Sequence, residues 1–437
     1  MLGLAKLLVV ILLDLGYLLA AIAALPWIIC RLVLHGDQRG FLQRFGAGLD
    51  EGLRGSIWLH GSSAGEISLL KPLVQLLEQD FPDTPLLISA YSSTGHATAS
   101  KLFPKHRVVF FPYDFSIIVF RFLRHFNPIL VVIMESEFWP NFLLASQSLG
   151  VPVAVLNGKM SPKSYRLHDW TRFISLILQN VPLIAVQTED HKKRLQRLGM
   201  PEHRVHVTGN MKYDLAQPLP NLKQTKNLRE KLGYESNDVV IIGGSLHKGE
   251  DDVLLEAYKR LSDQTASSSL IIVPRYPAEA TGFQQRAQAG GCRVILKTEI
   301  DGGRRPLGSK GILIADTVGE LSDLYALADI AFVGGSLFYR GGNKGGHNLM
   351  EPAILGLPIL FGPYSISFQE TVDALLDANA GIMVCDAIEL SNALESLLDD
   401  SENRRKMGIR AYEVIMNHQG ATERNYTLLL SLLKMET

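Results

Sequence analysis

The sequence contains little cysteine: Cys30, Cys292 and Cys385 are the three that occur among 437 residues, and no two of them are closely spaced. This argues against a disulfide framework and against a cysteine zinc site, because both need paired cysteines. An excess of one charge is also absent, since 43 lysines and arginines face 44 aspartates and glutamates. The composition therefore gives no electrostatic case for binding nucleic acid, and any anionic ligand must be met by a local basic cluster.

Metal-ligand clusters are scarce as well. The 12 histidines are scattered, and the closest candidate pair is His203 with His206. Neither has a carboxylate or cysteine partner at ligand spacing, which is typical of surface or loop histidines. We therefore expect no metal site.

Long apolar runs are absent after the first 34 residues, whereas residues 7–34 are almost continuously apolar apart from Asp14 and Arg31. A membrane span needs about 20 apolar residues, and residues 7–29 suffice if Asp14 is tolerated at some cost. We therefore expect residues 1–34 to form a membrane anchor.

The charges that flank this run predict its orientation. Arg31, Arg39 and Arg44 outnumber the single Lys6 before the run. The positive-inside rule then places the large C-terminal part in the cytoplasm, which the few unpaired cysteines also favour as a reducing compartment. A cleaved signal peptide is an alternative, although a charge inside the run would interrupt its short core, and a helix in the membrane interface is another.

Two series of short apolar runs alternate with helix-length segments. The first series comprises residues 57–60, 86–90, 108–111, 129–134, 151–156 and 183–187, and the second comprises residues 239–242, 270–273, 293–296, 312–315, 330–333 and 358–361. Strands separated by helices indicate parallel sheets covered on both faces. The predicted fold class is therefore α/β, with two Rossmann-like domains.

Residues 217–221 (QPLPN) interrupt this pattern and are predicted to be an interdomain linker. We expect an N-terminal domain at residues 35–216 and a C-terminal domain at residues 222–437, facing each other across a cleft. The tail at residues 401–433 is helical in pattern, and its last part could pack back on the N-terminal domain.

A glycine-rich turn in the second half has the composition of a nucleotide site. The run 330–333 leads into glycines, and residues 345–348 (GGHN) then open a helix that carries Glu351. Backbone N–H groups at such a helix start can hold a phosphate, and glycine permits close approach. A carboxylate one turn into the helix can accept hydrogen bonds from two ribose hydroxyls.

One such turn is weak evidence, because tight turns use glycine for local reasons. Residues 239–246 repeat the strand-and-glycine form, and the run 270–273 leads to Arg275. Polar groups at several strand ends indicate one shared crevice at the carboxyl edge of a parallel sheet.

The run at residues 57–60 ends in a sharp turn, residues 60–66 (HGSSAGE), before an amphipathic helix. Small residues let a substrate approach, and Glu66 at the helix start is expected to face the cleft, although it could simply complement the helix dipole. Residues 61–65 also fit the pattern G-x-S-x-G with Ser63 as nucleophile, so a serine hydrolase is an alternative.

Together these segments resemble the 3-deoxy-D-manno-octulosonic acid (Kdo) transferases of lipopolysaccharide assembly, which are GT-B glycosyltransferases. The resemblance covers essentially the whole chain, and the order of the motifs is specific although each one is weak. Besides the apolar N-terminus and residues 60–66, it includes residues 134–141 (MESEFWPN), 157–161 (NGKMS), 209–214 (GNMKYD), 273–275 (VPR), 319–321 (GEL) and 345–351 (GGHNLME).

The resemblance implies an inverting transfer of Kdo from CMP-Kdo to a lipid A precursor (lipid IVA), without a metal or cofactor. Glu66 matches the family's general base, which would take the proton of the acceptor hydroxyl. Glu135 and Lys212 match positions that stabilise the transition state. The positions that would contact CMP are Pro274, Arg275, Val318, Gly319, Glu320, Asn348, Leu349, Met350 and Glu351.

Within that set, Arg275 could pair with the phosphate and Glu351 with the ribose, while backbone groups around Gly319 could read the cytosine edge. The N-terminal domain would bind the acceptor and the C-terminal domain the donor. From the residues alone, Glu135 could equally be a helix-start carboxylate and Lys212 a solvated loop lysine.

The chain also departs from the family's pattern. Residues 341–344 form an insertion, Leu349 stands where proline is usual, and Lys159 stands where arginine is usual, which removes a bidentate fork. A nucleotide-sugar epimerase with the same two-domain architecture remains an alternative, but it gives no reason for a membrane anchor. No motif decides how many Kdo residues are added.

Overall fold

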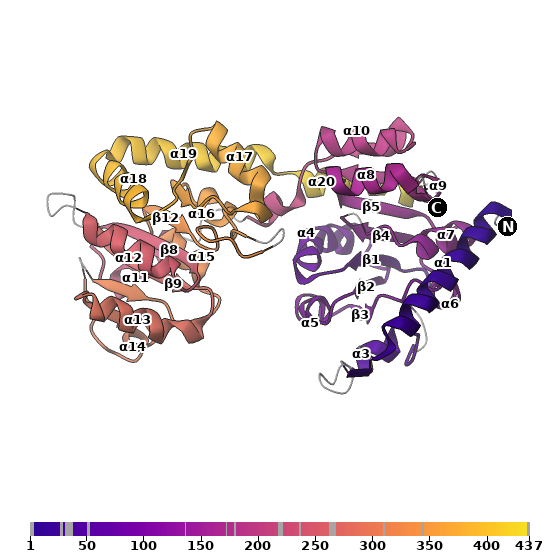
Figure 1. The fold of residues 1–437 in the computed structure, drawn as a ribbon, viewed down its shortest axis with the longest axis horizontal. Helices are drawn as coiled ribbons and strands as arrows, with labels where there is room; N and C mark the ends of the chain where they lie inside the picture. The colour runs from indigo at the N-terminus through magenta and orange to yellow at the C-terminus, as the bar shows by residue number, and fades with distance from the viewer. Residues whose placement is uncertain are drawn as a thin grey trace. The chain divides into compact units, whose positions relative to one another are not determined.

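The structure is a computed structural model that describes residues 4–26, 29–30, 38–49, 53–135, 137–171, 173–178, 181–216, 222–235, 237–261, 268–308, 311–341 and 345–434 (Figure 1). The chain forms two compact units. The first comprises Met1–Leu215 and Gln419–Thr437, and the second comprises Ala216–His418. The predicted linker at residues 217–221 lies outside the described residues.

The first unit is built on a parallel seven-stranded sheet of order β3-β2-β1-β4-β5-β6-β7. Its strands are β1 (Ile57–Gly61), β2 (Leu86–Ala90), β3 (Arg107–Phe110), β4 (Leu130–Met134), β5 (Val153–Gly158), β6 (Leu183–Val186) and β7 (Val205–Val207). The inner strands are buried on both faces, which is why they read as continuous apolar runs in the sequence.

Helices cover both faces of this sheet. Alternate residues of β1 serve different cores: Trp58 packs with one and Leu59 with the other. The core of Leu59 includes α4 (Ala64–Asp80), α5 (Ser93–Leu102) and α20 (Ala421–Leu433). The core of Trp58 includes α6 (Ser116–Phe126), α7 (Pro140–Ser148), α9 (Phe173–Leu178) and α10 (Glu189–Arg197), and α8 (Pro162–Thr171) packs against α9.

The second unit repeats the plan, with a parallel sheet of order β10-β11-β9-β8-β12-β13-β14. Its strands are β8 (Val239–Leu246), β9 (Ser268–Pro274), β10 (Val294–Leu296), β11 (Ile312–Ile314), β12 (Ile330–Val333), β13 (Ile359–Phe361) and β14 (Gly381–Met383). Its helices are α11 (Leu222–Lys231), α12 (Glu250–Arg260), α13 (Ala280–Ala289), α14 (Lys297–Asp301), α15 (Leu321–Ala326), α16 (Met350–Ile354), α17 (Gln369–Asp377), α18 (Ala387–Asp399) and α19 (Ser401–His418). The α/β prediction is thus confirmed, with two parallel sheets.

Each sheet has one more strand than the sequence predicts. The additional strands, β7 and β14, lie at sheet edges and have three residues each. Only one of their six residues, Val205, is buried, so neither strand produces an apolar run of the usual length.

The C-terminal tail contains two helices rather than one continuous helix. Gly420, with φ +86°, separates α19 from α20, and this left-handed backbone favours glycine. Asp214 accepts hydrogen bonds from the N–H groups of Gly420 (2.7 Å) and Thr422 (2.5 Å). These contacts, and the packing of α20 on α4, make the last helix part of the first unit.

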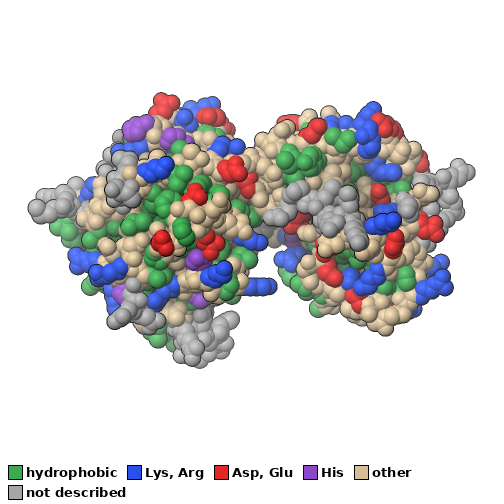
Figure 2. Space-filling model, turned by 180° about the vertical axis from the view of Figure 1, so that it is seen from behind, with side chains coloured by type: hydrophobic (Ala, Val, Ile, Leu, Met, Phe, Trp, Pro, Cys, Tyr) green, Lys and Arg blue, Asp and Glu red, His purple; other side chains and the backbone are tan. Residues whose placement is uncertain are grey.

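The N-terminal segment contributes α1 (Leu4–Ala23) and α3 (Gln38–Gln43), which packs on β3. Within α1, Lys6–Ala23 is long and apolar enough to cross a membrane, and only 6% of this segment is buried in the protein. On the faces drawn in Figure 2, basic and acidic side chains are interspersed over each unit, as the near balance of charge predicts.

Candidate active site

In the first unit, Glu66 lies in the first turn of α4, where its carboxylate bonds back to the two residues that precede the helix. Oγ of Ser63 accepts from the Glu66 N–H (3.3 Å) and donates to Glu66 Oε1 (2.9 Å), while the Ser62 N–H donates to Glu66 Oε2 (2.8 Å). A Cβ at Gly61 would lie 3.1 Å from Glu66 Cβ, so glycine lets the strand pass close to the helix start. The Glu66 carboxylate can therefore stabilise the start of α4 and still be available for a role in catalysis.

Burial, together with the nearby carboxylates of Glu135 and Glu137, raises the pKa of Glu66 to about 7, although the hydrogen bonds from Ser62 and Ser63 act in the opposite direction. A carboxylate with this pKa is present in both protonation states near neutral pH. That is the property a general base or acid needs.

Glu135 follows β4 directly and has a left-handed backbone, with φ +57°. Such a conformation is uncommon for a residue with a side chain and costs on the order of 1 kcal/mol. The Glu135 N–H donates to Leu156 O (2.8 Å), and Oε2 lies 2.6 Å from Nζ of Lys159, just beyond β5. The strained turn directs the carboxylate to the neighbouring strand end rather than to a helix start.

Glu137 joins the same cluster and was not among the predicted site residues. Burial raises its pKa, Glu135 raises it further, and Lys159 lowers it. The structure therefore brings three carboxylates and one lysine together at the carboxyl ends of β1, β4 and β5. In the sequence, Glu137 lies in the motif of residues 134–141, two residues after Glu135.

Lys212 lies in the short helix η2 (Met211–Leu215), which packs against α4. The N–H of Met211 donates to Oδ1 of Asn157 in β5 (2.9 Å), and the Lys212 N–H donates to Oδ1 of Asn210 (3.0 Å). These bonds hold the segment of Lys212 at the same edge of the sheet as Glu66.

The geometry of Ser63 does not match a serine nucleophile. Its backbone is extended (φ −118°, ψ 166°) rather than strained, and its hydroxyl is bonded to Glu66. The neighbouring His60 turns Nδ1 toward Ser89 Oγ (3.0 Å) and stacks on Phe111, and burial lowers the pKa of its imidazole to about 3. His60 is therefore a core residue, and the hydrolase alternative loses its basis.

In the second unit, two histidines from different loops meet. Nε2 of His247, after β8, lies 2.9 Å from Nε2 of His347, and the rings are stacked. Burial, together with the neighbouring His247 and Arg275, lowers the pKa of His347 to about 4. Burial and then Arg340 likewise lower the pKa of His247. The two arginines thus stand near an imidazole pair that carries little charge of its own at neutral pH.

The glycine-rich segment differs from the prediction in one respect. The N–H groups of Gly346 and His347 are used inside the protein, bonding to the carbonyls of Gly335 (2.7 Å) and Gly334 (3.2 Å). Helix α16 begins only at Met350, whose N–H bonds to Asn348 Oδ1 (3.1 Å). These three N–H groups are therefore not available to a phosphate. Of the predicted insertion, residues 342–344 lie outside the described residues.

A buried carboxylate that sequence reasoning missed holds the two loops together. Glu250 accepts four backbone hydrogen bonds: from His247 (2.9 Å) and Gly335 (2.7 Å) on Oε2, and from Ser336 (2.8 Å) and Leu337 (3.0 Å) on Oε1. Its side chain is fully buried. Glu250 therefore fixes the loop after β12 against the loop after β8.

Around α16, two of the predicted contact residues, Asn348 and Glu351, are partly exposed, and the other two are buried. Asn348 Nδ2 donates to Glu351 Oε1 (3.0 Å), and burial raises the pKa of Glu351 against this bond. Leu349 and Met350 are buried, so they could meet a ligand only through their backbone. Glu351 is held by Asn348 and remains partly exposed as a residue.

The remaining predicted contacts lie at the ends of β9 and before α15. Pro274 is the buried last residue of β9, and Arg275 next to it is exposed. Val318 is 83% exposed, and Gly319 has φ +89° with open space at its Cβ position. Glu320 is held by Lys297, at 2.9 Å, a buried lysine that the sequence did not reveal.

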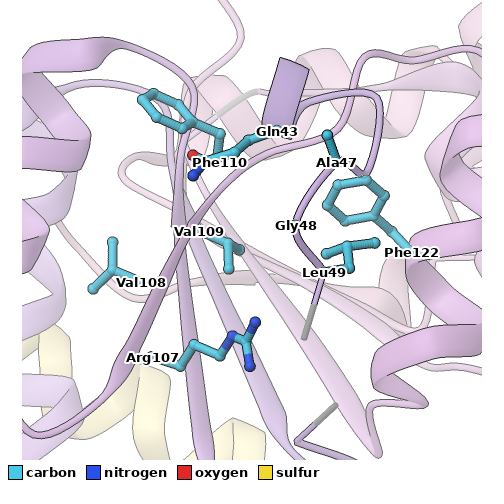
Figure 3. A pocket seen from close by; sticks show the side chains of 9 residues that line it. All are labelled: Gln43, Ala47, Gly48, Leu49, Arg107, Val108, Val109, Phe110 and Phe122. Carbon is cyan, nitrogen blue, oxygen red and sulfur yellow. The ribbon is translucent and has the colours of Figure 1, made fainter. Parts of the chain in front are cut away.

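A cavity of about 380 Å³ lies elsewhere in the first unit, at the edge strand β3 (Figure 3). It is lined by Gln43, Ala47, Gly48, Leu49, Arg107, Val108, Val109, Phe110 and Phe122. It contains none of the predicted site residues. The two candidate half-sites are therefore the strand ends around Glu66 and those around Arg275.

Comparison with solved structures defines the class of protein. A glycosyltransferase from Rickettsia africae matches with a TM-score of 0.54 at 13% identity, covering 87% of this chain and 99% of that chain. UDP-GlcNAc 2-epimerase from Neisseria meningitidis matches with a TM-score of 0.55 at 15% identity, covering 86% and 100%. At this identity the likeness shows the fold alone, which is GT-B-like, and gives the epimerase alternative no further support.

Sequence comparison then shows the family. The family model described as 3-deoxy-D-manno-octulosonic-acid transferase matches residues 39–215. The 3-deoxy-D-manno-octulosonic acid transferase of Haemophilus influenzae is 30% identical over 86% of this chain and 86% of its own length, and that of Chlamydia muridarum is 30% identical over 95% and 96%. The chain belongs to the Kdo transferase family of glycosyltransferases, and the resemblance predicted from the sequence is confirmed.

Proposed function

We propose that the enzyme transfers Kdo from CMP-Kdo to a lipid A precursor, lipid IVA, in lipopolysaccharide core assembly, with Glu66 as the general base. Family membership supports the transferred sugar, and the motif resemblance supports the donor and the acceptor. The observation that carries the role of Glu66 is its partly buried carboxylate, whose pKa is about 7.

In this reaction the acceptor binds to the first unit with one sugar hydroxyl against Glu66. The hydroxyl oxygen attacks the anomeric carbon of Kdo while Glu66 takes its proton, and the bond from that carbon to the CMP phosphate oxygen breaks. Attack opposite the leaving group inverts the configuration. CMP leaves with the bonding electron pair, and Glu66 later returns the proton to water.

The other charged residues near Glu66 would stabilise the charges that develop in the transition state. The anomeric centre becomes oxocarbenium-like in the transition state, and the carboxylates of Glu135 and Glu137 would stabilise that positive charge. Lys159 and Lys212 would offset the negative charge of the Kdo carboxylate or the leaving phosphate. Lys159 is suited to this role because it already balances Glu135.

The second unit would hold CMP. Arg275 and Arg340 would bind the phosphate beside the His247–His347 pair, because the nearby backbone N–H groups already have partners. Glu351 would accept hydrogen bonds from the ribose hydroxyls, and the exposed turn at Val318 and Gly319 would meet the cytosine. The apolar helix α1 would keep the enzyme at the inner membrane, with both units on the cytoplasmic face.

The experiment is acceptor-dependent release of CMP from CMP-Kdo by Glu66→Gln. The amide keeps the shape and one acceptor for the Ser62 N–H but cannot take a proton, so we expect turnover to fall by at least about 10³-fold with CMP-Kdo binding unchanged. Glu389→Gln is a matched control, because Glu389 makes the same first-turn contact in α18, from the Cys385 N–H at 2.8 Å. Retained turnover in Glu66→Gln would exclude Glu66 as the base.

The donor half is tested separately by CMP binding to Glu351→Ala. Loss of the ribose contact should weaken binding about ten-fold or more, measured by calorimetry. Unchanged affinity would place the nucleotide elsewhere.

A further inference from the structure

One face of α1 is occupied by contacts to the first unit. Its members, Lys6, Val10, Asp14 and Tyr17, are spaced by four, four and three residues, which places them on one stripe of a helix. Nζ of Lys6 donates to Gln147 Oε1 (2.7 Å), Val10 is buried in the core of Trp58, and the Tyr17 hydroxyl donates to Asp114 Oδ2 (3.1 Å).

Asp14 is the centre of this stripe. Its Oδ1 accepts from the Ser116 N–H (3.0 Å) and from Asn141 Nδ2 (2.8 Å), and its Oδ2 accepts from Ser116 Oγ. Ser116 is the first residue of α6, whose own preceding residue makes no side-chain cap. Asp14 therefore supplies the cap of α6 and also binds α7, so α1 is fixed beside both helices (Figure 1).

The opposite face of α1 is apolar and open. Leucines and isoleucines at eight positions are between 47% and 67% exposed: Leu7, Leu8, Ile11, Leu12, Leu15, Leu18, Leu19 and Ile22. The exposed face of α6 next to it carries Ile117, at 79% exposed, with Arg121 and Arg124 one and two turns later. Helix α6 contains no acidic residue.

We propose that α1 stays docked on the first unit and lies parallel to the membrane, with its open apolar face buried at the boundary between headgroups and acyl chains of an anionic bilayer. The exposed arginines of α6 then meet the lipid phosphates. This inference concerns how the protein meets the membrane and does not depend on the proposed reaction.

A crossing helix would contradict these contacts. The contacts from Lys6 to Tyr17 span about 16 Å of a helix about 30 Å long, at 1.5 Å per residue. If α1 crossed the hydrocarbon layer and kept these contacts, the polar N-termini of α6 and α7 would enter that layer with it. If α6 and α7 stayed outside, Asp14 would lose all its partners while lying near the centre of the layer. In the docked arrangement every polar side chain of the stripe keeps its partner.

The first test measures depth. In the full chain with Cys30, Cys292 and Cys385 replaced by serine, single cysteines at Leu8, Leu12, Leu15 and Leu19 would carry spin labels, with the protein bound to vesicles of phosphatidylethanolamine and phosphatidylglycerol. Power saturation with oxygen and a nickel chelate should give one shallow depth for all four labels. A depth profile that deepens toward the middle of the helix and becomes shallow again would overturn the proposal.

The second test separates docking from insertion. Asp14→Leu removes the cap of α6 and should lower the melting temperature in detergent by about 2 to 4 °C, whereas Leu15→Ala on the open face should leave it unchanged but weaken vesicle binding several-fold. If α1 crossed the membrane instead, Asp14 would have no partner in the first unit, and Asp14→Leu would leave the melting temperature unchanged. That result would overturn the proposal.

Discussion

Nζ of Lys159 lies 2.6 Å from Oε2 of Glu135, so an ion pair joins the ends of β5 and β4 beside Glu66. Lys159→Met removes the one positive charge that also lowers the pKa of Glu137. Glu135 and Glu137 would then repel each other, and we expect kcat to fall about ten-fold or more at pH 7.

Lys159→Arg keeps the charge and should recover most of this activity. The measurement is steady-state CMP release with both substrates varied. If Lys159→Met reached the wild-type kcat, the ion pair would have no part in the reaction.

The pH dependence of transfer follows from Glu66. Its pKa of about 7 means that kcat/KM should rise about ten-fold per unit below pH 7 and level off above pH 8, because the base must be ionised. Glu137→Gln removes one of the neighbouring charges that raise this pKa, so the midpoint should move to lower pH. Glu389→Gln should leave the midpoint in place, and a midpoint that does not respond to Glu137→Gln would refute the coupling.

The same carboxylate should make folding stability depend on pH. The pKa of Glu66 is raised from 4.5 to about 7 by folding, so the folded state holds its proton more tightly. Its favourable contribution is complete below pH 4.5 and is lost as pH rises through 7, by at most about 3 kcal/mol. Glu66→Gln does not titrate and should therefore gain stability relative to wild type at pH 8 but not at pH 4.5.

Urea unfolding of both proteins at the two pH values measures this difference. Glu389→Gln serves as the control for loss of a helix-capping carboxylate, because its contact is solvent-exposed. An equal difference between wild type and Glu66→Gln at both pH values would show that Glu66 has an ordinary pKa.

The sheets could be predicted from the sequence because parallel strands covered on both faces must be apolar along their whole length. The glycine turns were equally visible, but the partners of their N–H groups were not. The bonds from Gly346 and His347 to Gly335 and Gly334 depend on how two turns of one loop fold together. No local pattern distinguishes a glycine needed for that packing from one needed for a ligand.

Contacts between residues far apart in the sequence explain the other features of the structure that could not be predicted. Asp14 looked like a cost to a membrane helix, yet it caps a helix that begins 102 residues later. Glu137 in the first unit gains its charged neighbour Lys159, and Lys297 in the second unit gains Glu320, only when each chain segment folds against another. Roles for Glu66 and Glu351 could be predicted without such contacts, because those residues form part of short family motifs with a fixed order.

Glu250 offers the sharpest test of the second unit. Each of its carboxylate oxygens accepts hydrogen bonds from two backbone N–H groups. In Glu250→Gln an NH₂ group replaces one oxygen, and because NH₂ is itself a donor, it cannot accept from the two N–H groups that it faces. We expect the unfolding free energy of the second unit to fall by about 2 to 4 kcal/mol, because the lost bonds are fully buried. The loops that carry His247 and His347 should loosen with it, so CMP affinity should fall although Glu250 itself is too buried to touch the nucleotide. Urea unfolding and calorimetry with CMP measure the two effects, and normal stability with normal affinity in Glu250→Gln would show that these four bonds do not set the shape of the site.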